Sequence, residues 1–189
     1  MHVQATETPK PLRADARRNR ERIVEAARKV FAKHGAGAQM DDVAAAAGVG
    51  VGTVYRHFPH KEALMGELVA SKFRAFADNA ERALEVDDPW EAFAGLLRAN
   101  AELCARDVGV QQALAREPAA WSDAALEFTR LYELTSRLID RGTQAGVLRA
   151  DLAVEDIPML MGGLSVTMAV PQYDWRRHLE IILAGLRAA

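Results

Sequence analysis

Apolar side chains recur along most of the chain at the spacing of an amphipathic helix. The first such stretch spans residues 15–34, where Asp15 suits the N-cap and Gly35 suits a left-handed helix end. Positions three and four apart lie on one face of a helix, so this stretch can bury one side against a core. The apolar residues on that face are Ile23, Ala26, Ala27, Val30 and Phe31.

Glycine and proline divide the rest of the chain into further helical stretches, and runs of β-branched residues are absent. Residues 1–14 contain Pro9 and Pro11 and no periodicity, which predicts a flexible basic arm. We expect an all-α fold, with a small three-helix domain at residues 15–60 and a larger C-terminal helical bundle at residues 61–189. After the first helix, the expected helices are 41–47, a short one ending at Phe58, 61–86, one that begins at Asp88 and Pro89, 119–146, 154–170 and 174–187.

The charge of the chain is distributed unevenly. The whole chain carries a net charge of −2 at pH 7. Residues 1–61 contain 11 Lys and Arg against 6 Asp and Glu, a balance of +5, and the remainder contains 13 against 20, a balance of −7. A basic N-terminal segment on an acidic body indicates that only this segment meets a polyanion. Charge alone also fits a basic tail beside an ordinary solvated helix.

Cysteine content and hydropathy limit where the protein can work. The single cysteine, Cys104, rules out an internal disulfide and any cysteine-based zinc site, and it suits a reducing cytoplasm. The polar start does not resemble a signal peptide. The longest uncharged run, between Asp156 and Asp174, is shorter than the roughly 20 apolar residues of a membrane span. We expect a cytoplasmic protein without a membrane segment.

The segment DDVAAAAGVGVGTVYRHFPHK, residues 41–61, carries the clearest functional pattern. Two short helices joined by a glycine-containing turn form a helix-turn-helix unit. Gly48 suits the left-handed turn, and Val43 and Val49 can pack against the following helix. At about 100° per residue, Val51, Val54 and Phe58 form the inner face of the second helix.

The opposite face of that second helix offers groups that suit DNA. Tyr55 sits at the boundary, where its ring can pack while its hydroxyl reaches outward. Lys61 opens the next helix, where its ammonium and free backbone N–H groups can share one phosphate. The small, hydroxyl, guanidinium and imidazole groups on this face can meet phosphates and base edges in a major groove. They belong to Gly52, Thr53, Arg56 and His57.

The segment from Arg17 to Leu64, ending in GVGVGTVYRHFPHKEAL, resembles the DNA-binding domain of TetR-type (tetracycline-repressor-like) regulators. The resemblance implies about nine helices, with the last two forming a homodimer interface. It also implies a repressor that binds a palindromic operator in double-stranded DNA and leaves it when a small effector favours another spacing of the two DNA-binding domains. By resemblance, Arg56 reads bases, and the other contacts to phosphates or bases come from Thr53, Tyr55, His57 and Lys61.

Two positions depart from the pattern of that family. The family usually has a hydroxyl residue before the second helix, where this chain has Gln39 and Met40, and a serine at Gly50. Both hydroxyls would serve as caps or phosphate contacts, so this protein is expected to hold the DNA backbone with fewer hydrogen bonds. Arginines of the arm and the first helix, Arg17 among them, can compensate electrostatically, which would make DNA affinity more dependent on salt.

Polar residues on two apolar stripes of the C-terminal region suggest a ligand pocket. Asn100 lies on one stripe, and Tyr132 and Thr135 lie on another. Such groups can orient a small apolar or amphipathic ligand, although each one alone also fits a satisfied polar residue of a core. The candidate pocket residues are Phe76, Phe93, Leu97, Asn100, Cys104, Trp121, Phe128, Tyr132 and Met159.

The last two expected helices suggest self-association. Residues 157–170 are apolar nearly all round, so a helix there needs cover on more than one side. Glycine is a poor helix former, and two adjacent glycines make sense where two backbones approach closely. The alternative is that both helices form the core of a monomer. The expected dimer residues are Gly162, Gly163, Val166, Val170, Trp175, Leu179, Ile182 and Leu186.

These observations favour a DNA-binding transcriptional regulator over two other classes of protein. One rival is a helical ligand-binding or docking module whose basic face is merely solvated. The other is an enzyme, for which no catalytic arrangement, cofactor motif or phosphate-binding glycine loop is present in the sequence. We expect no metal site, because Pro59 separates His57 from His60 and keeps them off one helical face.

Overall fold

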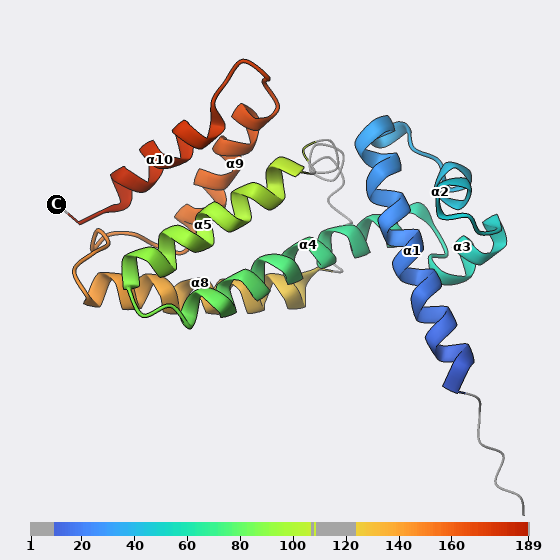
Figure 1. Ribbon diagram of the computed structural model, residues 1–189, viewed down its shortest axis with the longest axis horizontal. Helices are drawn as coiled ribbons and strands as arrows, with labels where there is room; N and C mark the ends of the chain where they lie inside the picture. Colours follow the sequence, from blue (N-terminus) through green and yellow to red (C-terminus); the bar gives the residue numbers. More distant parts are fainter. Residues whose placement is uncertain (1–9, 107, 109–123, 189) are drawn as a thin grey trace, which may run out of the picture.

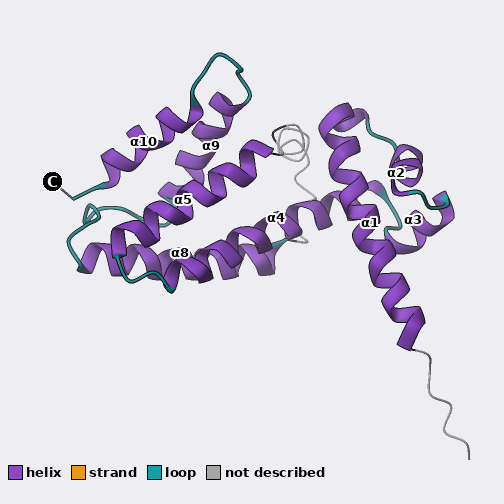
Figure 2. Ribbon diagram, viewed as in Figure 1, coloured by secondary structure: helices purple, strands orange, loops and turns teal. Residues whose placement is uncertain are grey.

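The computed structural model describes residues 10–106, 108 and 124–188. In this part of the chain the secondary structure is helical, and no strand forms (Figures 1 and 2). An isolated bridge between Leu148 and Arg187 joins the chain's end to the segment after α8. The expectation of an all-α fold is confirmed. The helices are α1 (Lys10–His34), α2 (Met40–Ala47), α3 (Val51–His57), α4 (Lys61–Leu84), α5 (Pro89–Arg106), α8 (Ala125–Gln144), α9 (Asp156–Met168) and α10 (Trp175–Leu186), with a 3-10 turn at Gly35–Gly37.

The helices enclose two hydrophobic cores. We call α1, α2 and α3 the head and α5, α8, α9 and α10 the body; α4 runs from one to the other (Figure 1). The first half of α4 packs into the head core through residues such as Leu64 and Leu68, and its second half packs into the body core through Ala77 and Ala80. The expected domain boundary at residue 60 therefore falls between two helices, but the first half of the next helix, α4, still belongs to the head core.

Two expected boundaries differ from the structure. The first helix begins at Lys10, not at Asp15, so residues 10–14 are helical. Pro11 does not prevent this, because a proline in the first turn lacks only an N–H that has no partner within the helix. The helix expected at 119–146 is described from Ala125 onwards, and its earlier part lies outside the described residues.

Side-chain caps begin several helices where the sequence predicts them. The Asp88 carboxylate accepts the backbone N–H of Glu91 at 2.8 Å, and Pro89 occupies the first helical position of α5. The Asp174 carboxylate accepts the N–H of Arg177 at 3.0 Å at the start of α10. These caps satisfy N–H groups that have no partner within the helix.

A glycine at the end of α8 allows the chain to turn back closely on that helix. Gly146 has φ 68° and reverses the chain, and the backbone N–H groups of Val147 and Leu148 both bond to the Gly142 carbonyl. The buried Leu148 side chain then lies directly over Gly142. A Cβ at Gly142 would be 2.5 Å from Cδ1 of Leu148, so this packing leaves no room for any other residue type.

We therefore predict that Gly142→Ala destabilises the protein by about 1–3 kcal/mol, the usual cost of overpacking a core. Gly95→Ala is the matched control, because Gly95 is exposed on α5 and its added Cβ would meet open space. That substitution should stabilise the protein by about 0.5–1 kcal/mol through helix propensity alone. Urea unfolding followed by circular dichroism measures both, and equal stability of the two variants would contradict the packing.

Candidate DNA-binding surface and ligand cavity

The turn between α2 and α3 is held by its own backbone and by an arginine from α1. Gly48 has φ 64°, a left-handed conformation that favours glycine. The N–H of Gly48 bonds to the carbonyl of Ala45 and that of Val49 to the carbonyl of Ala44, which completes the helix end. The Arg22 guanidinium donates to the remaining carbonyl of Ala47 at 2.6 Å. This contact fixes the turn to α1.

The two positions that depart from the TetR pattern have different local structures. Gln39 is the N-cap of α2, and its backbone N–H donates to the Asp42 carboxylate at 3.2 Å. Met40 is buried in the head core. Gln39 and Asp42 thus form a capping box, in which Gln39 takes the N-cap position of the family's hydroxyl residue. Gly50, the N-cap of α3, has no side-chain hydrogen bond, so the start of α3 has only its backbone N–H groups to offer.

Helix α3 presents one face to the core and another to solvent. Val54 and Phe58 are buried, as the helical spacing predicts. The prediction that Val51 shares this inner face is wrong: 42% of it is exposed. Val51 is the first residue of α3 and lies beyond the reach of the head core. The outward groups are as expected, with Gly52, Tyr55 and Arg56 exposed and Thr53 and His57 half-buried.

The start of α4 lies beside this face. The Lys61 ammonium is 5.5 Å from the centre of the buried Phe31 ring, a cation–π contact that holds the side chain near the head core. Sequence reasoning missed His60, whose Nδ1 accepts the N–H of Ala63 at 3.1 Å and so caps α4. Arg17 is exposed on α1, with Glu21 3.7 Å away. The contact partners predicted for DNA thus lie on α1, α3 and the start of α4.

The body contains a partly open cavity of about 410 Å³, lined mainly by α4, α5, α8 and α9. Phe76, Leu97, Asn100, Cys104, Phe128 and Tyr132, all expected at a pocket, line it. Phe93 does not line it, because its side chain is fully buried in the body core. Met159 does not line it either, because its side chain lies on the outer face of α9 and is 67% exposed. The predicted Trp121 lies outside the described residues.

The sequence prediction included only Phe76 from α4 and the outward-facing Met159 from α9, so most of what these two helices contribute to the cavity was missed. Val69, Lys72 and Phe73 extend the α4 wall beyond Phe76, and their three- and four-residue spacing was the available signal. Helix α9 contributes Ile157, Pro158, Met161, Gly162 and Ser165. The uniformly apolar sequence of α9 does not indicate which of its faces meets a cavity.

Few polar groups interrupt the apolar wall. Asn100 and Thr135 are 7% and 4% exposed, and both line the cavity. At the more exposed side, the Tyr132 hydroxyl donates to the Glu155 carboxylate at 2.6 Å. This hydrogen bond lowers the pKa of Glu155 and raises the pKa of Tyr132, because it stabilises the carboxylate and the neutral phenol. The cavity is therefore mainly apolar, with isolated hydrogen-bonding positions.

Both the N-terminal and the C-terminal part of the chain are similar to known protein families. Residues 23–68 match the model of bacterial regulatory proteins of the tetR family, and residues 88–188, more than half of the chain, match that of the SbtR-like transcriptional regulator C-terminal domain. The crystal structure of a TetR transcription regulatory protein from Mycobacterium vanbaalenii is 35% identical in sequence, with a TM-score of 0.70 over 94% of this chain and 100% of that one. The chain belongs to the TetR family.

Other relatives agree with this assignment. An HTH-type transcriptional regulator from Staphylococcus aureus (strain USA300) is 44% identical over 54 residues, which cover 28% of this chain and only 29% of that protein. The fatty acid degradation regulator FadR from Bacillus halodurans is 25% identical, with a TM-score of 0.73 over 90% of this chain and 97% of that one. The predicted helix-turn-helix regulator class is confirmed.

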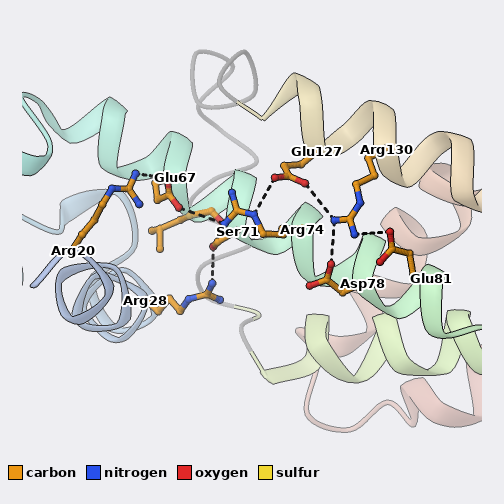
Figure 3. Close-up of polar contacts among 10 residues, drawn as sticks. Arg20, Arg28, Glu67, Ser71, Arg74, Asp78, Glu81, Glu127 and Arg130 are labelled. Atoms are coloured by element: carbon orange, nitrogen blue, oxygen red, sulfur yellow. Dashed lines mark hydrogen bonds and ion pairs between the residues drawn. The ribbon is translucent and has the colours of Figure 1, made fainter. Parts of the chain in front are cut away.

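Several arginines of this TetR-family chain bind within the protein. The Arg20 guanidinium donates to Glu67 of α4 at 2.5 Å and lies 4.9 Å from the centre of the Phe58 ring. The bond to Glu67 raises the pKa of Arg20. Arg28 donates to the hydroxyl of Ser71, one turn further along α4, at 2.6 Å (Figure 3). These basic residues contribute to the charge of the head, but their side chains are engaged by α4.

The ion pairs continue from the head into the body along one side of α4 (Figure 3). Arg74 lies 3.8 Å from Glu67 and 2.9 Å from Glu127 of α8. Glu127 is also 3.7 Å from Arg130, one turn further along α8. A continuous chain of charges therefore joins α1, α4 and α8. It ends where Arg130 pairs with two carboxylates of α4, Asp78 at 3.0 Å and Glu81 at 2.8 Å.

The residues predicted for a dimer interface fall into three groups. Leu179 and Leu186 are buried in the body core of their own chain, because α10 turns its apolar stripe toward that core. Val170, Trp175 and Ile182 are half-buried. Exposed positions comprise the predicted Gly162, Gly163 and Val166, together with Met159, Tyr173 and Ile181.

No metal site or membrane span is found among the residues that the structure describes. Groups of three or more His, Cys, Asp or Glu side chains able to hold a metal ion do not occur there. Within the same residues, every helix is too short or too polar to cross a bilayer.

We predict that Glu67→Gln lowers stability by about 1 kcal/mol, because it removes a largely buried carboxylate that pairs with the head and with Arg74. The expected loss is small because the Arg20 side chain is 42% exposed, so solvent screens its pairing with Glu67. Glu25→Gln is the control, since its ion pair with Lys29 is exposed on both sides. Chemical denaturation should show almost no change for Glu25→Gln, and equal losses in the two variants would count against the role of Glu67.

Proposed function

We propose that this regulator is a cytoplasmic homodimeric repressor that binds a palindromic operator in double-stranded DNA and leaves it when a small apolar or amphipathic effector fills the body cavity. The observation that carries the proposal is the pairing of an outward-facing α3 in the head with an apolar cavity in the body. A single helix, α4, contributes residues both to the head core, on which α3 packs, and to the wall of the cavity. The proposal includes no catalytic step, cofactor, metal or membrane contact.

DNA binding follows from the outward face of α3. Arg56 is exposed and Thr53 and His57 are half-buried, so a guanidinium, a hydroxyl and an imidazole share the outward face of α3, with the exposed phenol of Tyr55 at its edge. Gly52 has open space at its Cβ position, which lets a phosphate approach the backbone closely. A recognition helix of this kind positions itself through phosphates and reads bases in the major groove.

The position of α4 explains how an effector in the cavity would release the protein from DNA. Val69, Lys72, Phe73 and Phe76 line the cavity from this helix. In the same stretch of α4, Ser71 is bonded to the head through Arg28. A ligand that shifts or fixes this part of α4 therefore changes the position of the head. It would favour one spacing of the two heads over another in proportion to its different affinity for the two states.

Homodimer formation is supported by apolar residues left exposed on α9 and α10. Val166 and Met159 are each 67% exposed, and Ile181 is 56% exposed. Large apolar side chains gathered on neighbouring helices mark an interaction surface more often than scattered ones do. A two-fold axis through this surface would place two heads on a palindromic site. The similarity to a regulator of fatty acid degradation supports an apolar effector for this chain.

We predict that Tyr55→Ala and Lys61→Ala each weaken operator binding by about 1–3 kcal/mol, the strength of a lost charge-assisted or buried contact. Arg56→Ala should instead change which bases are preferred. The operator is selected from a random duplex pool, and affinity is measured by fluorescence anisotropy at fixed salt. Arg137→Ala is the control, because it removes an exposed cation from α8 of the body. Unchanged affinity in both folded head variants would refute the proposed surface.

We also predict that Val166→Arg produces a folded monomer that binds the operator weakly. Val166 is 67% exposed within one chain, so the substitution should disturb an interface and leave the core intact. Leu126→Arg is the control, because Leu126 is 80% exposed and lies in the first turn of α8, outside the proposed interface helices. Light scattering reports mass and circular dichroism reports folding. A mass near 20.7 kDa for the unmodified protein at micromolar concentration would exclude the dimer.

A further inference from the structure

One wall of the body cavity carries a buried amide whose orientation is set from outside the cavity. Asn100 of α5 is 7% exposed and lies among apolar residues of the cavity wall. An amide has a carbonyl oxygen that accepts and an NH₂ group that donates, and the two ends can exchange places by rotation. Which end faces the cavity therefore decides the chemistry of the ligand that fits there.

A chain of two hydrogen bonds determines this orientation. The Arg82 guanidinium donates to Oδ1 of Asn79 on α4, and Nδ2 of Asn79 donates to Oδ1 of Asn100 at 2.8 Å. A guanidinium has donors only, so the oxygen of Asn79 must face Arg82 and its nitrogen must face Asn100. The oxygen of Asn100 is thereby occupied. Its NH₂ group has no acceptor among the described residues and is left for the cavity.

The rest of the wall is compatible with an acceptor on the ligand. Of the described residues that line the cavity, none is acidic and Lys72 is the charged one. Thr135, which is 4% exposed, provides a second hydroxyl position on α8. Tyr132 already donates its hydroxyl to Glu155. A donor that faces an otherwise apolar cavity gains a hydrogen bond when a ligand brings an acceptor to it.

We propose that the cavity selects an apolar molecule with a carbonyl group that accepts a hydrogen bond from Nδ2 of Asn100. A pure hydrocarbon of the same shape fills the space but leaves the NH₂ group without a partner. An amine is disfavoured because the wall presents a donor and a cation. The inference rests on the proposed role of this cavity as the effector site, and it adds the class of molecule that the site holds.

Three probes that share one carbon skeleton test this selectivity: butyrophenone, which only accepts; 1-phenyl-1-butanol, which accepts and donates; and butylbenzene, which does neither. Their affinities are measured by calorimetry on the full-length protein. We expect butyrophenone to bind about five- to tenfold more tightly than butylbenzene, the gain of one hydrogen bond to a donor in the cavity wall. Equal affinities would overturn the carbonyl selectivity and leave the cavity as an effector site. No binding of any probe would overturn both proposals.

Asn79→Asp provides the sharper test, because Asn79 does not line the cavity. A carboxylate at position 79 accepts from both Arg82 and Asn100, so Asn100 would rotate and present its oxygen to the cavity. We expect the preference for butyrophenone over butylbenzene to disappear while 1-phenyl-1-butanol, which can donate, keeps its advantage. Asn100→Leu should abolish the preference for both oxygen-containing probes and retain butylbenzene. An unchanged preference for butyrophenone in either folded variant would overturn the proposal.

Discussion

Burial of one helix in two cores is the constraint on which the rest of this structure depends. The first half of α4 closes the head core through Leu64, Met65 and Leu68, and its second half closes the body core through Ala77 and Ala80. A straight helix cannot change its packing at one end without moving or bending at the other, because close-packed cores tolerate little displacement. Ala124, which immediately precedes α8, is also buried against the head core. The DNA-facing part and the ligand-facing part are thus mechanically continuous.

Electrostatics reinforces the same continuity. The excess of basic residues in the first 61 positions suggests that all of these cations face DNA. Arg20, Arg22 and Arg28 instead form hydrogen bonds within the protein. Arg22 secures the turn before α3, and the other two hold α1 against α4. Charge counts therefore overstate the number of cations available for DNA. The exposed Arg56 and Arg17 remain outward-facing cations of the head.

Local patterns predicted much of the fold and of the DNA-binding surface. The turn at Gly48, the helix starts at Asp88 and Asp174, and the buried Val54 and Phe58 follow from short-range geometry that spacing reveals. The exposure of Val51 was not predicted, because the periodicity of a seven-residue helix does not show where the hydrophobic core beneath it ends.

Tertiary placement accounts for the positions that the sequence could not predict. Phe93 and Leu97 lie on the same apolar stripe of α5, yet Leu97 lines the cavity and Phe93 is buried in the core beside it. Met159 and Met161 are both apolar residues of α9 and face opposite ways. The bond between Asn79 and Asn100 joins residues of different helices, and no single-helix pattern contains it.

Helix α9 has a further consequence because its two sides have different neighbours. Met161 lines the cavity, whereas Met159 and Val166 are each 67% exposed on the outer side of the helix. In the proposed dimer, a cavity ligand and the partner subunit would contact the same short helix. Thermodynamic linkage then works in both directions: whatever the ligand does to subunit association, association does to ligand affinity by the same factor. Apparent ligand affinity would therefore vary with protein concentration, and dilution in the cell would itself be a regulatory variable.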